Sequence, residues 1–419
     1  MPFNVKLYYT NAVLCIIIFL TQSCAKNENN GSNNNDTTQV GTLPPVETNS
    51  PNTNYSAAFS GQTRIAGIKT GAAYKVENIQ RNLNSPWAIV PLPDGRLLIT
   101  EKAGTMKIFS ASGQLEKTVT GLPVVDAGGQ GGLLDAAPDP DFSNNRVLYW
   151  SFSETQAGGG NLMALAKGIL SANETTIENA SVIFRATPKL TNSNLHYGSR
   201  IAFSIDGNLF VSTGERSVME GRVQAQRLNS NLGKIFRLTK DGEPAAGNPF
   251  AEDDNANPEI YAYGIRNPQG LAIHPVTGDL WEAEFGPRGG DEVNIIKAGK
   301  NYGWPTITYG IEYSGATIGQ GITQKDGMEQ PVYYWDPVVS PSGITFYTGD
   351  AIPEWKNNLF LGALSGKHIV RLVIDANNKV VAEERLMADK NERVRDIANH
   401  PNGSLYAVTD EGNLYRIGM

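Results

Sequence analysis

Cysteine is almost absent from this chain, whose 419 residues include two cysteines, Cys15 and Cys24. Cys15 lies within an apolar run near the N-terminus, in a segment of the kind that is removed during export. Removal of that segment would leave Cys24 without a partner, which excludes an internal disulfide from the exported protein.

A basic surface is also missing. The chain has 35 Lys and Arg residues against 42 Asp and Glu residues, a formal net charge of -7, and its basic residues are dispersed. Nucleic-acid binding depends on clustered positive charge, so this composition argues against nucleic acid as a partner.

Long amphipathic helices are missing too, whereas turn-forming residues are abundant. The sequence contains 44 glycines and 23 prolines, with aromatic and β-branched residues plentiful between them. This composition is typical of a turn-rich all-β protein rather than of a disordered chain.

The apolar run at residues 12–20 is too short to span a membrane. Lys6 precedes the run, and Leu20-Thr21-Gln22-Ser23-Cys24 follows it, so residues 1–24 resemble a bacterial lipoprotein signal. This resemblance implies an exported periplasmic or outer-membrane protein that contacts the membrane only through a lipid on Cys24. An ordinary signal peptide and an uncleaved anchor helix are the alternatives.

Residues 25–62 consist mainly of Asn, Thr, Ser, Pro and Gly, with almost no large apolar side chain. A segment of this kind buries too little apolar surface to offset the entropy lost on ordering. We therefore predict a flexible polar tether between the lipid and the folded body.

Residues 63–419 exceed the usual size of one hydrophobic core, so they form either several domains or a closed array of repeats. A pair of turn residues between two short strand-like segments recurs six times: Asp94-Gly95, Asn144-Asn145, Asp206-Gly207, Thr277-Gly278, Asn357-Asn358 and Asn402-Gly403. This pattern predicts an all-β fold, a six-bladed β-propeller with one repeat per blade. We expect the last strand, 414–417, to pair with a strand near residues 74–83.

His196 is the first candidate functional residue. It directly precedes two alternating segments around Asp206-Gly207, a strong hairpin signal, so a sheet holds the histidine loop in place. Imidazole titrates near neutral pH, which makes His196 a candidate general base. From these residues alone, a loop histidine held by hydrogen bonds is the simpler interpretation.

Arg266 and Asn267 form a second candidate, because Pro268 holds the backbone before it extended. A guanidinium beside an amide suits an anionic, carbonyl-rich ligand, and a structural salt bridge is the alternative.

A third candidate is the glycine-rich segment 284–294, in which Gly286 and Pro287 allow carbonyl oxygens to turn toward one point. Carbonyls and carboxylates are the ligands of calcium, although the spacing is not that of an EF-hand. A glycine-rich turn with solvated acidic side chains is the alternative.

Six motifs together resemble the soluble aldose sugar dehydrogenases that depend on pyrroloquinoline quinone (PQQ). They follow one another within about residues 80 to 419 and are Gly129–Asp135, His196–Arg200, Tyr263–Gly270, Gly286–Glu292, Asn301–Pro305 and Arg393–Asp396. The resemblance implies a six-bladed propeller that binds PQQ, oxidises an aldose at its anomeric carbon to a lactone, and passes electrons to a separate acceptor.

The resemblance also implies a role for each matching residue. His196 would take the proton of the anomeric hydroxyl, and Arg266 would polarise the cofactor. The residues implied in cofactor binding are Gln130, Arg266, Asn267, Trp335, Arg393 and Arg395. The carbonyls of Gly286 and Pro287 would hold the calcium bound to PQQ, and Asp291, Glu292 and Tyr302 would belong to a second, structural calcium.

Two positions depart from the family pattern. Leu195 stands where relatives carry a carboxylate before the base, so other groups must set the orientation and pKa of His196. Ser365 stands where relatives place a lysine on the cofactor, and Lys367 lies two positions further on.

Two other functional classes compete with the dehydrogenase, namely a propeller lactonase or hydrolase and a cofactor-free propeller that displays a polysaccharide or protein site. Arg266, Arg393 and Arg395 favour the quinone enzyme, because they share a purpose only if a polycarboxylate is bound.

Overall fold

The computed structural model of the protein describes residues 40–419. The predicted lipoprotein segment, Cys24 included, and the first part of the predicted tether lie outside the described residues. Within the described part, no helix is both long enough and apolar enough to cross a membrane.

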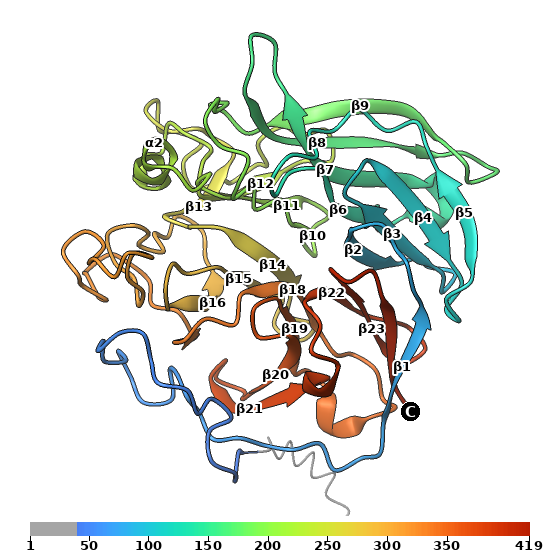
Figure 1. The fold of residues 1–419 in the computed structure, drawn as a ribbon. Coiled ribbons are helices and arrows are strands. Elements are labelled where there is room, and N and C mark those ends of the chain that lie inside the picture. The colour runs from blue at the N-terminus through green and yellow to red at the C-terminus, as the bar shows by residue number, and fades with distance from the viewer. Residues whose placement is uncertain (1–39) are drawn as a thin grey trace, which may run out of the picture. The chain divides into compact units, whose positions relative to one another are not determined.

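Residues 40–419 contain 24 strands, which form six antiparallel sheets of four strands each (Figure 1). Five sheets use consecutive strands of the chain. These are β2 (Pro86–Pro91), β3 (Leu97–Glu101), β4 (Thr105–Phe109) and β5 (Leu115–Val119); β6 (Leu133–Pro138), β7 (Val147–Thr155), β8 (Asn161–Leu170) and β9 (Ile177–Arg185); β10 (Ile201–Phe203), β11 (Leu209–Thr213), β12 (Lys234–Leu238) and β13 (Ile260–Tyr263); β14 (Pro268–Ile273), β15 (Leu280–Glu284), β16 (Asp291–Ile296) and β17 (Tyr333–Trp335); and β18 (Pro341–Phe346), β19 (Leu359–Ala363), β20 (His368–Ile374) and β21 (Val380–Leu386).

The sixth sheet joins the two ends of the described chain. It contains β22 (Val394–Asn399), β23 (Leu405–Thr409) and β24 (Leu414–Gly418), and β1 (Lys75–Gln80) is its outermost strand. Lys75 lies opposite Gly418, and Figure 1 shows the blue β1 beside the red strands of this blade. The predicted pairing of the last strand with an N-terminal strand is confirmed.

The six sheets are the blades of a propeller. The first strand of each blade contacts the first strands of the two neighbouring blades, so β2, β6, β10, β14, β18 and β22 form a closed ring. Each of the six turn pairs lies between the first and second strands of its blade. The predicted six-bladed β-propeller is therefore confirmed.

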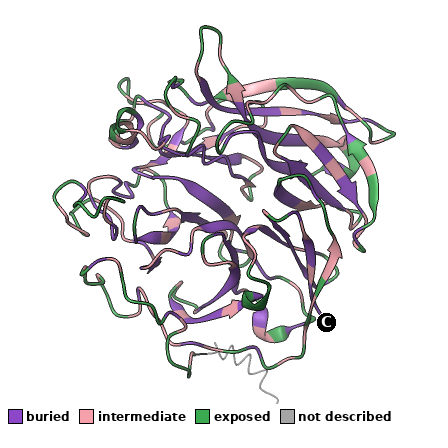
Figure 2. Cartoon of the chain, in the orientation of Figure 1, coloured by how far each residue is buried: buried purple, intermediate pink, exposed green. Residues whose placement is uncertain are grey.

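Apolar side chains fill the spaces between neighbouring blades. Because successive side chains of a strand point to opposite faces, each sheet contributes to the core on both of its sides. Trp150 belongs to the core between the first two blades, and Trp281 to the core between the fourth and fifth. Figure 2 shows the resulting buried strands, with exposed residues concentrated in loops and outer strands.

The helices are short and lie in the connections. Those described are α1 (Phe142–Asn145) and α2 (Met219–Arg222), together with the 3-10 helices η1 (Val223–Gln226), η2 (Pro353–Trp355) and η3 (Ala388–Lys390). Two of them, α2 and η1, follow Glu215, so the chain leaves the propeller after this residue and returns at β12.

Residues 40–73, which we call the N-terminal strap, pack against the outer parts of the fourth and fifth blades. Asn52 and Thr53 donate four hydrogen bonds of 2.8–3.0 Å to the buried carboxylate of Asp336. Glu47 accepts from Arg385 at 2.8 Å, and Gln62 is fully buried. In contrast to the flexible tether predicted for residues 25–62, polar side chains of residues 40–62 are hydrogen-bonded to the blades.

Candidate active site

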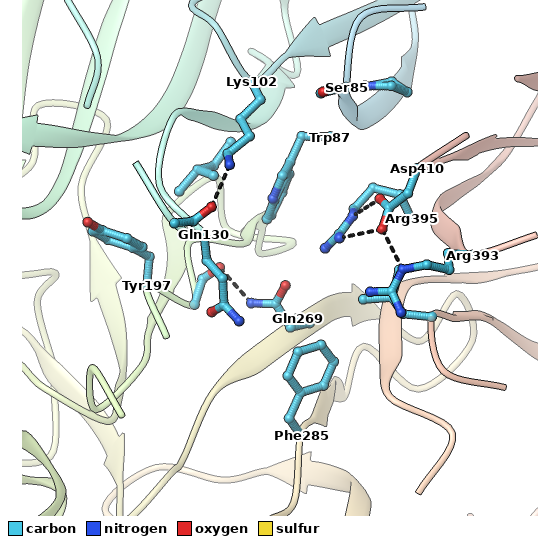
Figure 3. Close-up of a pocket in the computed structure, with 15 residues that line it drawn as sticks. Ser85, Trp87, Lys102, Gln130, Tyr197, Gln269, Phe285, Arg393, Arg395 and Asp410 are labelled. Carbon is cyan, nitrogen blue, oxygen red and sulfur yellow. Dashed lines mark hydrogen bonds and ion pairs between the residues drawn. The ribbon is translucent and has the colours of Figure 1, made fainter. Parts of the chain in front are cut away.

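A cavity of about 300 Å³ opens on the propeller face opposite the six turn pairs (Figure 3). Within each blade the start of the first strand and the end of the second lie at the same edge, since the two strands are antiparallel. The loops and strand ends at this edge, contributed by all six blades, supply the cavity wall, which comprises Ser85, Pro86, Trp87, Lys102, Gly129, Gln130, Leu134, Tyr197, Gly198, Gln269, Phe285, Leu364, Arg393, Arg395 and Asp410.

Arg393 and Arg395 lie together on one wall and share the carboxylate of Asp410. Arg393 donates through Nε at 2.9 Å, and Arg395 donates through Nε and Nη2 at 2.8 and 3.0 Å. Burial raises the pKa of Asp410, but the two arginines outweigh burial and lower it overall. Two guanidinium groups on one carboxylate leave a net positive wall, which suits an anionic ligand.

Gln130 links this cavity to His196. Its side-chain oxygen accepts a hydrogen bond of 2.8 Å from the backbone N–H of His196. Gly198, two residues further on, has a φ of +66°, and a Cβ atom there would lie 2.7 Å from the backbone nitrogen of Gly214. A glycine is therefore required where the histidine loop passes close to the end of β11.

The ring of His196 is held by a carboxylate from another part of the chain. Its Nδ1 atom lies 2.8 Å from Oε1 of Glu215, and both side chains are buried. No hydrogen bond to Nε2 of His196 is present within residues 40–419. Burial and the nearby charge of Arg266 lower the pKa of His196 to about 4, although Glu215 acts in the opposite direction. The imidazole is neutral at physiological pH.

Arg266 and Asn267 lie beneath the wall formed by Gly198 rather than in the wall itself. Oδ1 of Asn267 accepts from the backbone N–H of Gly198 at 3.1 Å, and its buried Nδ2 has no protein acceptor among the described residues. Oε2 of Glu284 accepts from the backbone N–H groups of Arg266 and Asn267, at 2.6 and 3.1 Å. Glu284 thus fixes the backbone of both predicted cofactor residues.

A second hollow, of about 10 Å³, adjoins Arg266. Its wall includes four residues predicted as calcium ligands, Gly286, Pro287, Glu292 and Tyr302. A hollow of this size holds about one water-sized particle. The structure therefore brings residues predicted for two separate calcium ions around one small space.

Asp291, the fifth predicted metal ligand, does not belong to this hollow. Its carboxylate accepts backbone hydrogen bonds from Gly286, Val339 and Ser340, at 2.8, 2.8 and 2.6 Å. Oδ2 accepts two of these bonds and Oδ1 accepts one. Asp291 holds the turn at Gly286 against the fifth blade, and its assignment as a calcium ligand stays a prediction.

Oxygen-bearing side chains also lie below the hollow, on one face of β15 and β16. Glu284 lies opposite Glu292, and Glu282 lies opposite Asn294. Oε1 of Glu282 and Oδ1 of Asn294 are buried without a hydrogen-bond partner among the described residues. Burial raises the pKa values of Glu282, Glu284 and Glu292. Unpartnered buried oxygens and raised carboxylate pKa values are both consistent with a cation at this place.

The described residues contain no group of three or more His, Cys, Asp or Glu side chains arranged to hold a metal ion. A calcium ion here would therefore need backbone carbonyl oxygens as well as carboxylates, a combination that calcium accepts readily. The carbonyl of Gly286 accepts from Nη1 of Arg266 at 2.8 Å. The hydroxyl of Tyr302 accepts from Lys297 N–H and donates to Ile295 O, so only the main chain of Tyr302 is suited to a ligand.

Trp335, predicted to bind the cofactor, does not line the cavity. Its side chain is 2% exposed and belongs to the apolar core between the fourth and fifth blades. Trp87 and Phe285 are the large apolar aromatic rings of the cavity wall instead (Figure 3). Trp335 is the last residue of β17, and the family resemblance alone does not separate a rim position from a core position.

Neither Ser365 nor Lys367 lines the cavity. Oγ of Ser365 forms a hydrogen bond of 2.8 Å with Oγ of Ser340. The lysine of the wall is Lys102, which follows β3. Sequence reasoning missed Lys102, as well as Trp87, Glu215 and Glu284. Trp87 lies near the start of the first strand of its blade, and Lys102, Glu215 and Glu284 lie at or just after the end of the second strand of theirs. Side chains at these positions reach this face of the propeller.

The glucose/sorbosone dehydrogenase family model matches residues 83–416 of the chain. Aldose sugar dehydrogenase YliI of Escherichia coli K12 is 41% identical over 350 residues, which cover 83% of this chain and 93% of that protein. The structure of the soluble aldose sugar dehydrogenase from Escherichia coli in its apo form has a TM-score of 0.78 and 40% identity, covering 83% of this chain and 99% of that one.

A PQQ-bound structure of aldose sugar dehydrogenase from Streptomyces coelicolor is also similar. It has a TM-score of 0.67 and 30% identity, and the match covers 84% of this chain and 99% of that one. The fold, the sequence motifs and these matches cover the same part of the chain, from the first blade to the last. The chain therefore belongs to the glucose/sorbosone dehydrogenase family.

Proposed function

We propose that this protein oxidises aldose sugars at the anomeric carbon to lactones, with PQQ as hydride acceptor and calcium beside it. The observation that carries the proposal is one cavity that joins the Arg393–Arg395 pair to Gln130, the residue that holds the backbone of His196. A polycarboxylate quinone suits this wall, since charge-assisted hydrogen bonds to guanidinium groups are strong. The PQQ-bound relative from Streptomyces coelicolor supports the choice of cofactor.

When bound, PQQ supplies a quinone carbonyl that accepts the hydride, and calcium supplies a Lewis acid that polarises this carbonyl. Arg393 and Arg395 would hold the cofactor's carboxylates, and Gln130 would donate through its amide nitrogen. Nδ2 of Asn267 is a further donor, buried without a protein acceptor among the described residues. Trp87 and Phe285 would exclude water from the faces of the ring system.

His196 acts as the general base. Its Nδ1–H donates to Glu215, which leaves the lone pair of Nε2 to accept the proton of the anomeric hydroxyl. Glu215 then stabilises the imidazolium cation that forms, as a carboxylate does behind a catalytic histidine. Because Glu215 and His196 are both buried, little solvent screens their attraction.

Calcium would be held at the hollow beside Arg266. The candidate ligands are the carboxylate of Glu292 and the main-chain oxygens of Gly286, Pro287 and Tyr302, which line that space. Glu284 is a further carboxylate in the same wall. This mixture of carboxylate and carbonyl oxygens fits calcium rather than a softer metal.

The test of this function uses purified apoprotein supplied with PQQ and calcium chloride, with reduction of an artificial electron-acceptor dye as the readout. A panel of aldoses should reduce the dye without any nicotinamide, and protein without PQQ should be inactive. Demonstrated PQQ binding without dye reduction over the whole panel would contradict the sugar assignment. Activity that requires NAD instead would contradict the cofactor assignment.

We also propose that the protein is an exported lipoprotein anchored through Cys24. The support is the apolar run at residues 12–20, which ends shortly before this cysteine. The Cys24→Ser variant should appear in the soluble fraction with unchanged turnover, while the wild type stays with membranes. A Cys24→Ser protein that remains firmly in the membrane fraction would indicate an uncleaved anchor.

A further inference from the structure

Lys102 occupies a fixed position on the cavity wall opposite the arginine pair (Figure 3). Its backbone N–H donates to Ser85 O at 3.0 Å, and its carbonyl accepts from Leu133 N–H at 3.0 Å. Gly132 has a φ of +134°, and a Cβ atom there would lie 2.3 Å from the carbonyl oxygen of Lys102. The fold thus requires a glycine where this lysine packs against the start of the second blade.

The ammonium group of Lys102 has one hydrogen bond and no salt bridge within residues 40–419. Nζ donates to Gly129 O at 2.5 Å, and no carboxylate among residues 40–419 forms a salt bridge with it. Lys107, on the next strand, differs in this respect because its Nζ lies 2.8 Å from Oε1 of Glu101. The cavity wall therefore contains a lysine whose charge the described protein does not neutralise.

The charges of the cavity wall do not balance. Lys102, Arg393 and Arg395 are three cations, and Asp410 is the one acidic side chain in the wall. The three cations and one anion leave an excess of two positive charges, which a ligand with two or three carboxylates would offset. Burial and the charge of Arg395 lower the pKa of Lys102, although Asp410 acts in the opposite direction, so Lys102 and Arg395 repel one another.

We propose that Lys102 binds a carboxylate of the cofactor, so that it completes with Arg393 and Arg395 a three-cation site for a polycarboxylate quinone. This inference rests on the proposed function. Lys102, in the first blade, takes the place of the cofactor-binding lysine that the sequence analysis sought at Ser365 or Lys367. Neither Ser365 nor Lys367 lines the cavity. Lys102 is then a cofactor-binding residue with no role in proton transfer.

The experiment compares Lys102→Met, which keeps the length of the side chain but not its charge, with Lys102→Arg and with the control Lys107→Met. The dissociation constant for PQQ is measured in calcium buffer by quenching of tryptophan fluorescence, at two salt concentrations. We expect Lys102→Met to weaken binding about tenfold or more and to reduce the salt dependence of affinity. Lys102→Arg should stay near the wild type, and so should Lys107→Met.

Thermal unfolding of the apoproteins separates binding from structural support of the Gly129 loop. Removal of a repelled charge should leave the melting temperature of Lys102→Met unchanged or slightly higher. Affinity within twofold of the wild type, or an affinity loss that accompanies an equal destabilisation of the apoprotein, would overturn the proposal. Failure of the wild type to bind PQQ would instead refute the proposed function, and this inference with it.

Discussion

Nδ1 of His196 lies 2.8 Å from Oε1 of Glu215, two residues separated by the whole first hairpin of the third blade. Leu195, directly before His196, offers no carboxylate, and Glu215 supplies one from the other end of the hairpin. The interaction fixes one tautomer of the ring, because Nδ1 must carry the proton to donate it to the carboxylate. Nε2 is then the basic nitrogen.

The pH dependence of turnover follows from this arrangement. Burial and Arg266 lower the pKa of His196 from an ordinary value of 6.5 to about 4. Because the base must be unprotonated, turnover at saturating sugar should stay constant from neutral pH down to about pH 5 and fall near pH 4. Between pH 6.5 and about pH 4 the unfolded chain therefore binds more protons at His196 than the folded chain does. The free energy of unfolding should decrease as pH falls through this range.

The variant Glu215→Gln checks whether the fall in turnover near pH 4, the acidic limb of the pH profile, belongs to His196. Glu215 raises the pKa of His196, so its neutralisation should move the limb to lower pH and reduce turnover, while PQQ affinity stays near the wild-type value. A pH profile with its midpoint at or above 6.5 in the wild type would contradict the neutral, buried imidazole. A limb that Glu215→Gln leaves in place would belong to another group.

The variant His196→Gln separates chemistry from binding. The bond to Gln130 uses the backbone N–H of His196, so replacement of the ring should leave PQQ and calcium binding nearly unchanged. Loss of a general base should lower turnover by roughly 10²- to 10⁴-fold. Rates at saturating sugar with fully loaded enzyme measure the effect. Turnover within a few-fold of the wild type would remove His196 from the mechanism.

The variants Arg393→Ala and Arg395→Ala should weaken PQQ binding more than they weaken folding. Each removes one charge-assisted contact to a carboxylate, which contributes about 1.5 kcal/mol or more, or roughly tenfold in affinity. Arg416→Ala is the matched control, because Arg416 pairs with Glu77 on the outer strands of the same blade. Titration with PQQ decides the question, and unchanged affinity in both variants would assign the arginines a structural role with Asp410.

The fold could be predicted from the sequence because its information is local. Each pair such as Asp206-Gly207 marks the hairpin between the first two strands of a blade, and six such pairs fix the number of blades. The pairing of β24 with β1 could be predicted because an unpaired edge strand would expose its backbone N–H and C=O groups. These signals depend on turn chemistry and alternation, which neighbouring residues determine.

The site was predicted less completely, because its geometry depends on contacts between distant segments. Gln130, Arg393 and Arg395, which belong to the sequence motifs, line the cavity. Spacing could not show that backbone N–H groups of another blade occupy the carboxylate of Asp291, or that Trp335 faces the core. Glu215 was missed for the same reason, since only the paired hairpin brings it to His196.

The last prediction concerns residues 40–62 of the N-terminal strap. Their composition predicts a flexible tether, whereas their hydrogen bonds to the blades indicate that they stabilise the fold. Asp336 is 4% exposed, and its carboxylate accepts four hydrogen bonds from Asn52 and Thr53. A chain that begins at residue 63 loses these donors and Glu47, one of the two carboxylate partners of Arg385. Since each buried polar group left without a partner costs about 1 to 3 kcal/mol, this chain should unfold several degrees below a chain that begins at residue 40.

A second substitution identifies the contact responsible. Asp336→Asn replaces an acceptor with an amide that faces the same N–H donors, so it should destabilise the chain that begins at residue 40. In the chain that begins at residue 63 those donors are gone, and the same substitution should have little effect. Thermal unfolding of the four proteins completes this double-mutant cycle. Equal melting temperatures for the two parent chains would show that residues 40–62 act as a tether after all, despite their hydrogen bonds to the blades.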